Sequence, residues 1–224
     1  MVAPLRWQAT ALLVIAPEWH GLAVCRSERC EDHSRAPPPV RAMISSVTFR
    51  EASLADVEAL VAVHVASWYE TYTGILPDEV LARISVSNSA AMWRKILVGP
   101  DDILRAAIIL VEEDRNAVGF GSYGLQSDQS LLDSGFSGEI GAIYILRSHQ
   151  RRGIGRLLMG AMASELSGAG HFAASLWVVR ENAPALAFYN KLGGTVVEER
   201  LEDGLGSVLV EKAYGWLDIS HLRV

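Results

Sequence analysis

The segment from residue 139 to residue 167 restricts the fold of this chain more than any other. It opens with the apolar run EIGAIYIL (139–146), which is typical of a buried strand, and continues into GRLLMGAMASEL, whose apolar residues recur at helical spacing. A basic loop with two glycines, Gln150-Arg151-Arg152-Gly153-Ile154-Gly155, joins the two runs. This order predicts a strand, a loop and a helix, with the helix N-terminus presented by the loop.

That loop has the properties of an anion-binding site. A helix N-terminus offers free N–H groups and the positive end of the helix dipole. Gly153 and Gly155 carry no Cβ atom to hold a phosphate away, and Arg151, Arg152 and Arg156 add positive charge. A solvated basic turn that only starts a helix explains the same residues, so the loop by itself leaves both interpretations open.

Helical and strand-like segments alternate along the rest of the chain. Residues 54–72 repeat apolar side chains at helical spacing, with Ser53 as a candidate cap and Asp56 in the first turn. Residues 126–138 are predicted to form a polar loop. The other expected elements are helices at 77–84, 88–98, 153–167 and 183–192, and strands at 44–52, 104–113, 117–125, 139–146, 172–179, 194–202 and 206–214. Such a mixture of hairpins and crossovers predicts an α/β fold with a mixed sheet between helices.

Composition argues against several kinds of partner. The formal net charge is −6, whereas a general nucleic-acid binder is normally basic, so no nucleic acid is expected as a partner. No apolar run approaches the roughly 18 residues that span a bilayer, so no membrane is expected either. The two cysteines, Cys25 and Cys30, both lie near the N-terminus. A core without a disulfide framework fits a reducing compartment, and we expect the protein in the cytoplasm.

Residues 1–42 differ from the rest and show no sustained periodicity. We expect a leader that is disordered or that reflects a mis-assigned start, followed by one folded domain over residues 43–224. The apolar run before Pro17 lacks a clean cleavage site for a secretory signal. Four potential zinc ligands lie in the leader: His20, Cys25, Cys30 and His33. We do not interpret these four residues as a structural zinc site, and no metal is expected.

A second glycine pattern, Gly119-Phe120-Gly121-Ser122-Tyr123-Gly124, matches the G-x-G-x-x-G of dinucleotide-binding folds. That fingerprint requires a strand before it and a helix that opens within it. Here the glycines lie inside a strand signal and a polar loop follows, which indicates a bulge or a close backbone approach. The sequence contains no Walker loop either. An unrelated nucleotide enzyme is therefore disfavoured.

The segment Gln150–Gly155 resembles the Q/R-x-x-G-x-G/A motif that follows the fourth strand in the GNAT superfamily of acyl-CoA-dependent N-acetyltransferases. A later segment, RENAPALAFYNKLGG (180–194), is similar to that family's N-x-x-[AS]-x-x-[FL]-Y-x-[KR]-x-G-F, although Gly194 stands where phenylalanine is usual. The positions of this segment that fit the pattern include Asn182, Ala185, Tyr189 and Gly193. The order of the elements also agrees, so the resemblance covers about residues 46–213.

The resemblance implies a mostly antiparallel central sheet, flanked by helices and splayed between strands four and five, that takes acetyl-CoA as a co-substrate. The pantetheine arm would lie in that gap on the backbone of Ile143, Tyr144 and Ile145, with Asn182 as a further contact. The pyrophosphate would rest on amides of the basic loop, in agreement with the anion argument above. The loop residues implied are Arg151, Arg152, Gly153, Ile154, Gly155 and Arg156.

The reaction implied is direct attack of a primary amine on the acetyl thioester in a ternary complex. An alkylammonium with a pKa of about 10.4 must first lose a proton, and a carboxylate can accept it directly or through water. Trp177 occupies the strand-five position where many relatives have a glutamate, so Glu139 on strand four is the candidate base. Tyr189 is the candidate acid that protonates the departing thiolate. The alternatives are a solvent-facing Glu139 and a Tyr189 that only packs.

By the same resemblance, Trp68 and Tyr72 lie where the acceptor pocket is usually built, next to Glu70 and the turn 72–74. The two aromatic residues are four apart and share a helix face, where they could hold a cation or belong to the core. His64 on that face is expected to be a packed histidine. The expected acceptor is a small-molecule amine or a peptide N-terminus. The sequence is compatible with a homodimer.

Because the strand-five glutamate is absent, a second function is consistent with the same residues. It is a non-catalytic acyl-CoA-binding or regulatory module on the same fold. An enzyme would lose turnover and keep acetyl-CoA binding when Glu139 or Tyr189 is changed, whereas a pure binder has no turnover to lose.

Overall fold

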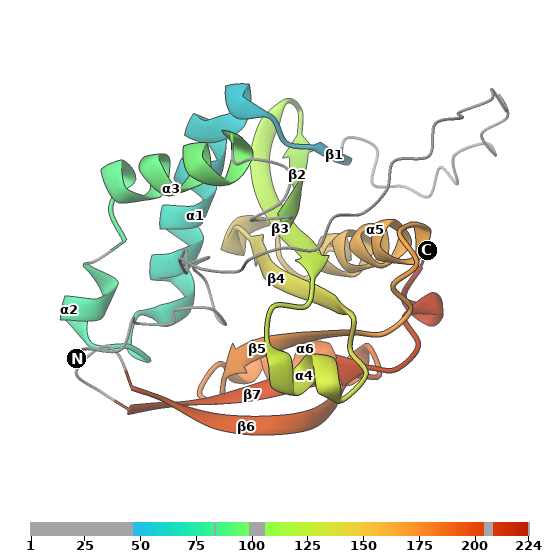
Figure 1. Ribbon diagram of the computed structural model, residues 1–224. Coiled ribbons are helices and arrows are strands. Elements are labelled where there is room, and N and C mark those ends of the chain that lie inside the picture. Colours follow the sequence, from blue (N-terminus) through green and yellow to red (C-terminus); the bar gives the residue numbers. More distant parts are fainter. Residues whose placement is uncertain (1–46, 83, 99–105, 204–207, 224) are drawn as a thin grey trace, which may run out of the picture.

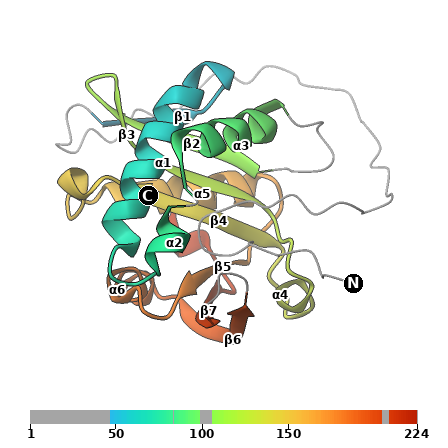
Figure 2. The same cartoon turned by 90° about the vertical axis from the view of Figure 1, so that its left-hand side faces the viewer.

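The computed structural model describes residues 47–82, 84–98, 106–203 and 208–223. The predicted leader (1–42), the domain start at Met43 and the first residues of the strand expected at 44–52 lie outside the described residues. Within the described ranges, one central sheet is covered by helices on both faces (Figures 1 and 2).

The sheet has seven strands in the order β1-β2-β3-β4-β5-β7-β6 (Figure 1). Its strands are β1 (Val47–Glu51), β2 (Ala106–Glu113), β3 (Asn116–Leu125), β4 (Gly138–Ile145), β5 (Ala174–Val179), β6 (Thr195–Asp203) and β7 (Val208–Trp216). Neighbouring strands run antiparallel except β4 and β5, which are parallel. The predicted mixed, mostly antiparallel sheet is therefore confirmed.

The helices form a layer on each face of the sheet (Figure 2). One layer contains η1 (Leu54–Asp56), α1 (Val57–Tyr72), α2 (Asp78–Leu81) and α3 (Val86–Val98); the other contains α5 (Ile154–Gly168) and α6 (Ala183–Lys191). Two further short 3₁₀ turns are η2 (Arg147–His149) and η3 (Ser220–Leu222). Each layer covers its own cluster of buried apolar side chains, so the sheet separates two halves of the core.

The first helix starts as the sequence predicts, with a tighter first turn. The Asp56 carboxylate accepts hydrogen bonds from the Ser53 N–H at 2.7 Å and from the Ser53 hydroxyl at 2.8 Å. Arg50 donates to the same carboxylate at 2.6 Å and holds the pKa of Asp56 well below its usual range. The turn Leu54–Asp56 is 3₁₀, so the α-helix itself begins at Val57.

A short helix, α4 (Gln129–Asp133), lies where the sequence predicted only a polar loop. The Asp128 carboxylate caps it by accepting a hydrogen bond from the Ser130 N–H at 3.0 Å. Leu131 is buried and packs in a small cluster with Phe136 and Trp177. The prediction missed this helix because five residues are too few to show a helical period.

The G-x-G-x-x-G pattern lies entirely within β3, as the sequence context indicated. A Cβ atom on Gly119 would lie 2.4 Å from Ile145 Cδ1 and 2.7 Å from the Tyr144 carbonyl oxygen. A Cβ atom on Gly121 would lie 2.7 Å from Met162 Sδ. These glycines therefore allow β4 and α5 to approach β3 closely, and they form no turn into a helix.

Replacing Gly119 with alanine is expected to lower the free energy of unfolding by about 1–3 kcal/mol, because the new methyl group would overlap the β4 backbone. Urea denaturation measures the change. Gly168→Ala is the control, since a Cβ there meets nothing within 4 Å. A Gly119→Ala protein as stable as the wild type would contradict the close approach.

Strands β4 and β5 separate soon after they begin. Their parallel pairing consists of Gly138 with Ala174 and Glu139 with Ser175. At this narrow end, the Gln126 side chain donates a hydrogen bond to the Ser175 hydroxyl at 2.6 Å. From Ile140 onward the two strands diverge, which confirms the predicted splay between strands four and five.

Candidate functional site

The loop after β4 presents the N-terminus of α5. Gly153 is the N-cap and has a φ of 86°, a left-handed conformation that favours glycine. The Gln150 side chain donates to the Ile145 carbonyl oxygen at 2.9 Å and so ties the loop to the end of β4. The helix starts at Ile154. Because its cap residue is a glycine, the cap supplies no side-chain oxygen to accept hydrogen bonds from the first N–H groups of the helix.

The two glycines of this helix N-terminus leave its backbone open. A Cβ atom on Gly153 would meet nothing within 4 Å, and one on Gly155 would meet only the Phe188 ring, at 3.4 Å. Packing within the described protein therefore does not require glycine at position 155. A ligand that approaches the backbone N–H groups does require it, which supports the anion-binding interpretation over a simple basic turn.

The three predicted phosphate-binding arginines differ in their surroundings. The Arg152 guanidinium pairs with both oxygens of Glu113, at 2.9 and 2.5 Å, and His149 lies 3.1 Å from the same carboxylate. Arg151 and Arg156 are exposed on the loop and the first turn of α5. The charge of Arg152 is thus already balanced within the protein, whereas Arg151 and Arg156 are exposed to solvent.

Helix α1 is tied to the start of this loop. The Glu70 carboxylate accepts a hydrogen bond from the Arg147 N–H at 2.8 Å, and the Arg147 side chain donates to the Glu70 carbonyl oxygen. Glu70, expected near an acceptor pocket, therefore braces the segment that leads from β4 into the anion loop.

Four predicted site residues come together where β4 and β5 diverge. The Tyr72 hydroxyl at the end of α1 is hydrogen-bonded to Tyr144 on β4 and to Asn182 at the start of α6. The Asn182 side chain also accepts from the Ala185 N–H at 3.3 Å and so caps the N-terminus of α6. Burial raises the pKa of Tyr72, Tyr144 and Tyr189, and the nearby Tyr189 phenol raises the first two further. We call the hydroxyl groups of Tyr72, Tyr144 and Tyr189, together with the amide side chain of Asn182, the hydroxyl cluster.

The aromatic pair on α1 is buried. The Trp68 and Tyr72 ring centroids are 4.5 Å apart, and both side chains belong to the core beneath α1–α3. His64 is fully buried, and its Nδ1 lies 3.3 Å from the Ser89 hydroxyl. His64 is therefore the packed histidine that was expected, and Trp68 forms part of the wall behind the hydroxyl cluster.

Glu139 lies at the narrow end of the splay. Its Oε2 accepts hydrogen bonds from the Ser127 N–H at 2.9 Å and from the Ser127 hydroxyl at 2.7 Å. Burial raises the pKa of Glu139, while the two Ser127 donors oppose the shift. The side chain is partly exposed and is held against the loop before α4 by these two hydrogen bonds.

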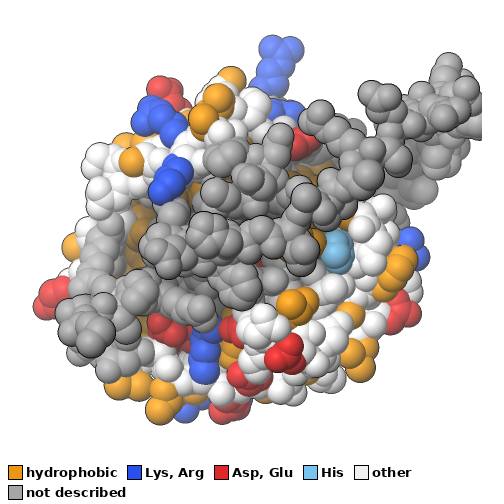
Figure 3. Space-filling view, viewed as in Figure 1, with side chains coloured by type: hydrophobic (Ala, Val, Ile, Leu, Met, Phe, Trp, Pro, Cys, Tyr) orange, Lys and Arg blue, Asp and Glu red, His pale blue; other side chains and the backbone are white. Residues whose placement is uncertain are grey.

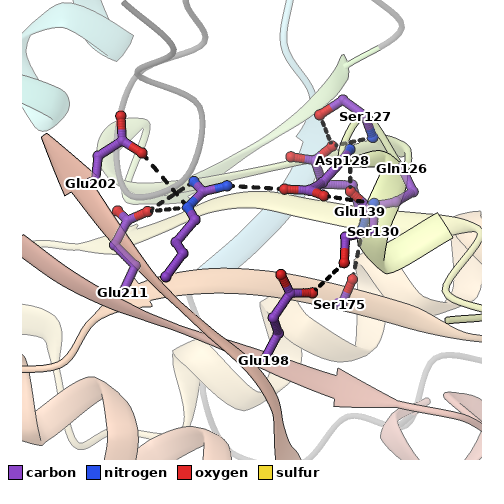
Figure 4. A network of polar contacts seen from close by, with 10 residues as sticks. Gln126, Ser127, Asp128, Ser130, Glu139, Ser175, Glu198, Glu202 and Glu211 are labelled. Carbon is purple, nitrogen blue, oxygen red and sulfur yellow. Dashed lines mark hydrogen bonds and ion pairs between the residues drawn. The ribbon is translucent and has the colours of Figure 1, made fainter. Parts of the chain in front are cut away.

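A polar network that the sequence did not predict lies beside Glu139 (Figure 4). The Arg200 guanidinium lies 2.9 Å from Asp128 Oδ2 and 2.8 Å from Glu211 Oε2, and its carbon is 4.0 Å from the centre of the Trp177 ring. Glu211 is only 4% exposed. Burial raises the pKa of Glu211, although Arg200 opposes the shift.

Acidic side chains gather over α4 and the β6–β7 hairpin on the face shown in Figure 3. Those in or near the network are Asp128, Asp133, Glu198 and Glu202. The surroundings of Arg200 are therefore negative overall, even after its own charge is counted.

No group of three or more His, Cys, Asp or Glu side chains that could hold a metal ion occurs among the residues described above. In the same part of the chain, no helix has the length and apolarity needed to cross a membrane.

Gly194, the departure from the second motif, has a local explanation. A Cβ atom there would lie 2.5 Å from Cζ2 of Trp216. The Trp216 indole N–H donates to the Leu192 carbonyl oxygen at 2.9 Å and so covers the end of α6. An aromatic ring from β7 thus fills the space next to the position where phenylalanine is usual.

Comparisons with known proteins agree with this geometry. Residues 66–194 match the acetyltransferase (GNAT) family. The chain is 33% identical to the uncharacterized N-acetyltransferase YuaI of Bacillus subtilis over 178 residues. The aligned region covers 79% of this chain and 96% of that protein.

Solved structures share the fold at lower identity. The PaiA N-acetyltransferase of Thermoplasma acidophilum, in complex with coenzyme A, has a TM-score of 0.59 and 24% identity, and covers 75% of this chain and 98% of that one. The yncA protein of Salmonella typhimurium, with acetyl-CoA, has a TM-score of 0.57 and 21% identity, and covers 78% of this chain and 95% of that one.

A sheet splayed after its fourth strand, with a glycine-containing loop and a helix N-terminus at the end of that strand, matches the architecture predicted from the resemblance to acyltransferases. The family match spans more than half of the chain. The protein belongs to the GNAT family of acetyltransferases.

Proposed function

We propose that the protein transfers an acetyl group from acetyl-CoA to a primary amine by direct attack in a ternary complex. One observation carries this proposal. The same splay has an open, uncapped helix N-terminus at Gly153–Gly155 and a buried hydroxyl cluster. A phosphate-bearing ligand with a long arm can occupy the first and extend to the second.

Each part of this arrangement has a role. Amides from Arg151 to Arg156 would bind the pyrophosphate, with Gly153 and Gly155 allowing its approach. The backbone of Ile143–Ile145 on the diverging β4 would pair with the pantetheine arm, and Asn182 would add a contact at the far end. Bound in this way, acetyl-CoA supplies an activated thioester.

The protein's side chains can move the protons that the transfer requires. The acceptor ammonium, with a pKa of about 10.4, loses a proton to a carboxylate; its nitrogen then bonds to the acetyl carbon as the C–S bond breaks. Tyr189 donates a proton to the departing thiolate. The Tyr189 phenol is protonated at neutral pH and so has a proton to give, and the pKa rise caused by burial makes its transfer to the thiolate an uphill step.

Replacing Tyr189 with phenylalanine is expected to lower kcat by about 100-fold while the Kd for acetyl-CoA stays within about threefold. Thiol release with n-butylamine, L-lysine and a tripeptide measures turnover, and calorimetry measures binding. Tyr69→Phe is the control, because Tyr69 is on α1 and exposed. Unchanged turnover in Tyr189→Phe would remove this residue from the chemistry.

A non-catalytic acyl-CoA-binding module is the second candidate. Trp177 fills the strand-five position where a base is often found, and Arg200 stacks on it. Tight acetyl-CoA binding without thiol release across a broad amine panel would favour this alternative.

Several wider features belong to the proposal. Residues 43–224 would form the catalytic domain, and the acceptor would be a small-molecule amine or a peptide N-terminus. The acidic surroundings of Arg200 support a cationic acceptor. A cytoplasmic location and a homodimer remain predictions; gel filtration of the purified protein tests the second.

A further inference from the structure

Glu211 lies on the sheet face that carries Tyr72 and Tyr144. In β5 and β7, Val179 is directly opposite Glu211, and directly opposed residues point to the same face of a sheet. Val179 and Leu209, two residues from Glu211 on the same strand, both pack in the α1–α3 half of the core with Tyr72. The position of Glu211 therefore follows from strand register and packing.

Glu139 lies at the other end of the same gap. Its partner on β5 is Ser175, four residues before Val179, which corresponds to about 13 Å along an extended strand. On β4, Glu139 precedes Tyr144 by five residues, or about 16 Å. Glu211 is thus the buried carboxylate beside the wide end of the splay, and Glu139 is held by Ser127 at the narrow end.

The groups around Glu211 suit a base with a defined orientation. Arg200 and Glu202 face it from β6, and Tyr72 faces it from α1. Arg200 Nε and Nη2 lie 2.9 and 2.8 Å from Oε2, so one carboxylate oxygen has a fixed direction. The negative charge on Glu211 contributes to the raised pKa of the Tyr72 hydroxyl. That hydroxyl is hydrogen-bonded to Tyr144 and Asn182.

We propose that Glu211, rather than Glu139, accepts the proton of the acceptor ammonium, an assignment that rests on the proposed acetyl transfer. The ammonium gives one proton to the Glu211 carboxylate, which becomes a neutral carboxyl group. The amine nitrogen then forms its bond to the acetyl carbon, the C–S bond breaks, and the thiolate takes the proton of Tyr189. The amide nitrogen loses its second proton to the Tyr189 phenolate, which is thereby restored, and Glu211 returns its proton to solvent.

The test compares the same substitution at three glutamates. Glu211→Gln is expected to lower kcat/KM for n-butylamine, L-lysine or a tripeptide by about 100-fold or more, with the calorimetric Kd for acetyl-CoA within about threefold. Glu139→Gln is expected to change kcat/KM by less than about fivefold. Glu199→Gln is the matched control, because Glu199 is on the same hairpin, is exposed and pairs with Lys212 on the other face.

The aspartate variants keep the test decisive if Glu211→Gln does not fold. Glu211→Asp retains a carboxylate beside Arg200 and is expected to shift the pH at which kcat/KM rises, whereas Glu139→Asp leaves that pH unchanged. The reverse pattern, or full activity in Glu211→Gln, overturns the assignment while the proposed function stands. A wild-type protein that binds acetyl-CoA and acetylates no amine overturns the proposed function and this assignment together.

Discussion

Replacing Gly155 with aspartate is expected to raise the Kd for acetyl-CoA by about 100-fold or more, because a carboxylate would enter the space where the phosphates bind. The fold should tolerate the change. A Cβ atom at this position meets only the Phe188 ring, at 3.4 Å, and an acidic residue in the first turn of a helix is favourable. Lost binding with unchanged stability would therefore locate the anion at this N-terminus.

Two further variants separate charge from size in that experiment. Gly155→Ala adds only a methyl group, so its effect on Kd should be much smaller. Gly168→Asp places the same carboxylate at the far end of α5, where a Cβ meets nothing within 4 Å, and should leave Kd unchanged. Equal affinity in Gly155→Asp and the wild type, measured by calorimetry, would contradict the phosphate site.

Much of the fold could be predicted because its elements are long enough to show a period. The strand at 139–146 and the helix at 153–167 appear in the structure at Gly138–Ile145 and Ile154–Gly168. The glycine pattern at 119–124 was correctly placed in a strand, because no helix signal follows it. The helix α4 has five residues and gave no period to detect.

The candidate site could be predicted only in part. Asn182 and Tyr189 are seven residues apart and belong to one motif, so the sequence alone pointed to both. Arg200 meets Asp128 across 72 positions and Glu211 across 11, and no local pattern pairs them. Whether Glu211 faces the splay or the opposite side depends on the register of β5 and β7, which a sequence alone does not specify.

The same register creates a buried ion pair whose loss should be costly. Arg200→Met is expected to lower the free energy of unfolding by about 3–5 kcal/mol near neutral pH, because it leaves the Glu211 carboxylate buried without its partner. Methionine can still pack on the Trp177 ring, so the lost charge is the main change. Urea denaturation at about pH 8 and about pH 5.5 measures the effect.

The pH dependence follows from the direction of the shift at Glu211. Burial raises its folded pKa, so the ionised group opposes folding above that pKa, and protonation removes the penalty as the pH falls toward the usual glutamate range. Without Arg200 the folded pKa of Glu211 rises further, and the loss of stability should therefore be smaller at about pH 5.5 than at about pH 8.

The double variant Arg200→Met, Glu211→Gln should recover most of the free energy of unfolding. Lys212→Met breaks only a pair with an exposed partner and should change the free energy of unfolding by less than about 1 kcal/mol. An equal loss at both pH values, with no recovery in the double variant, would show that the Glu211 charge does not govern the stability of this hairpin.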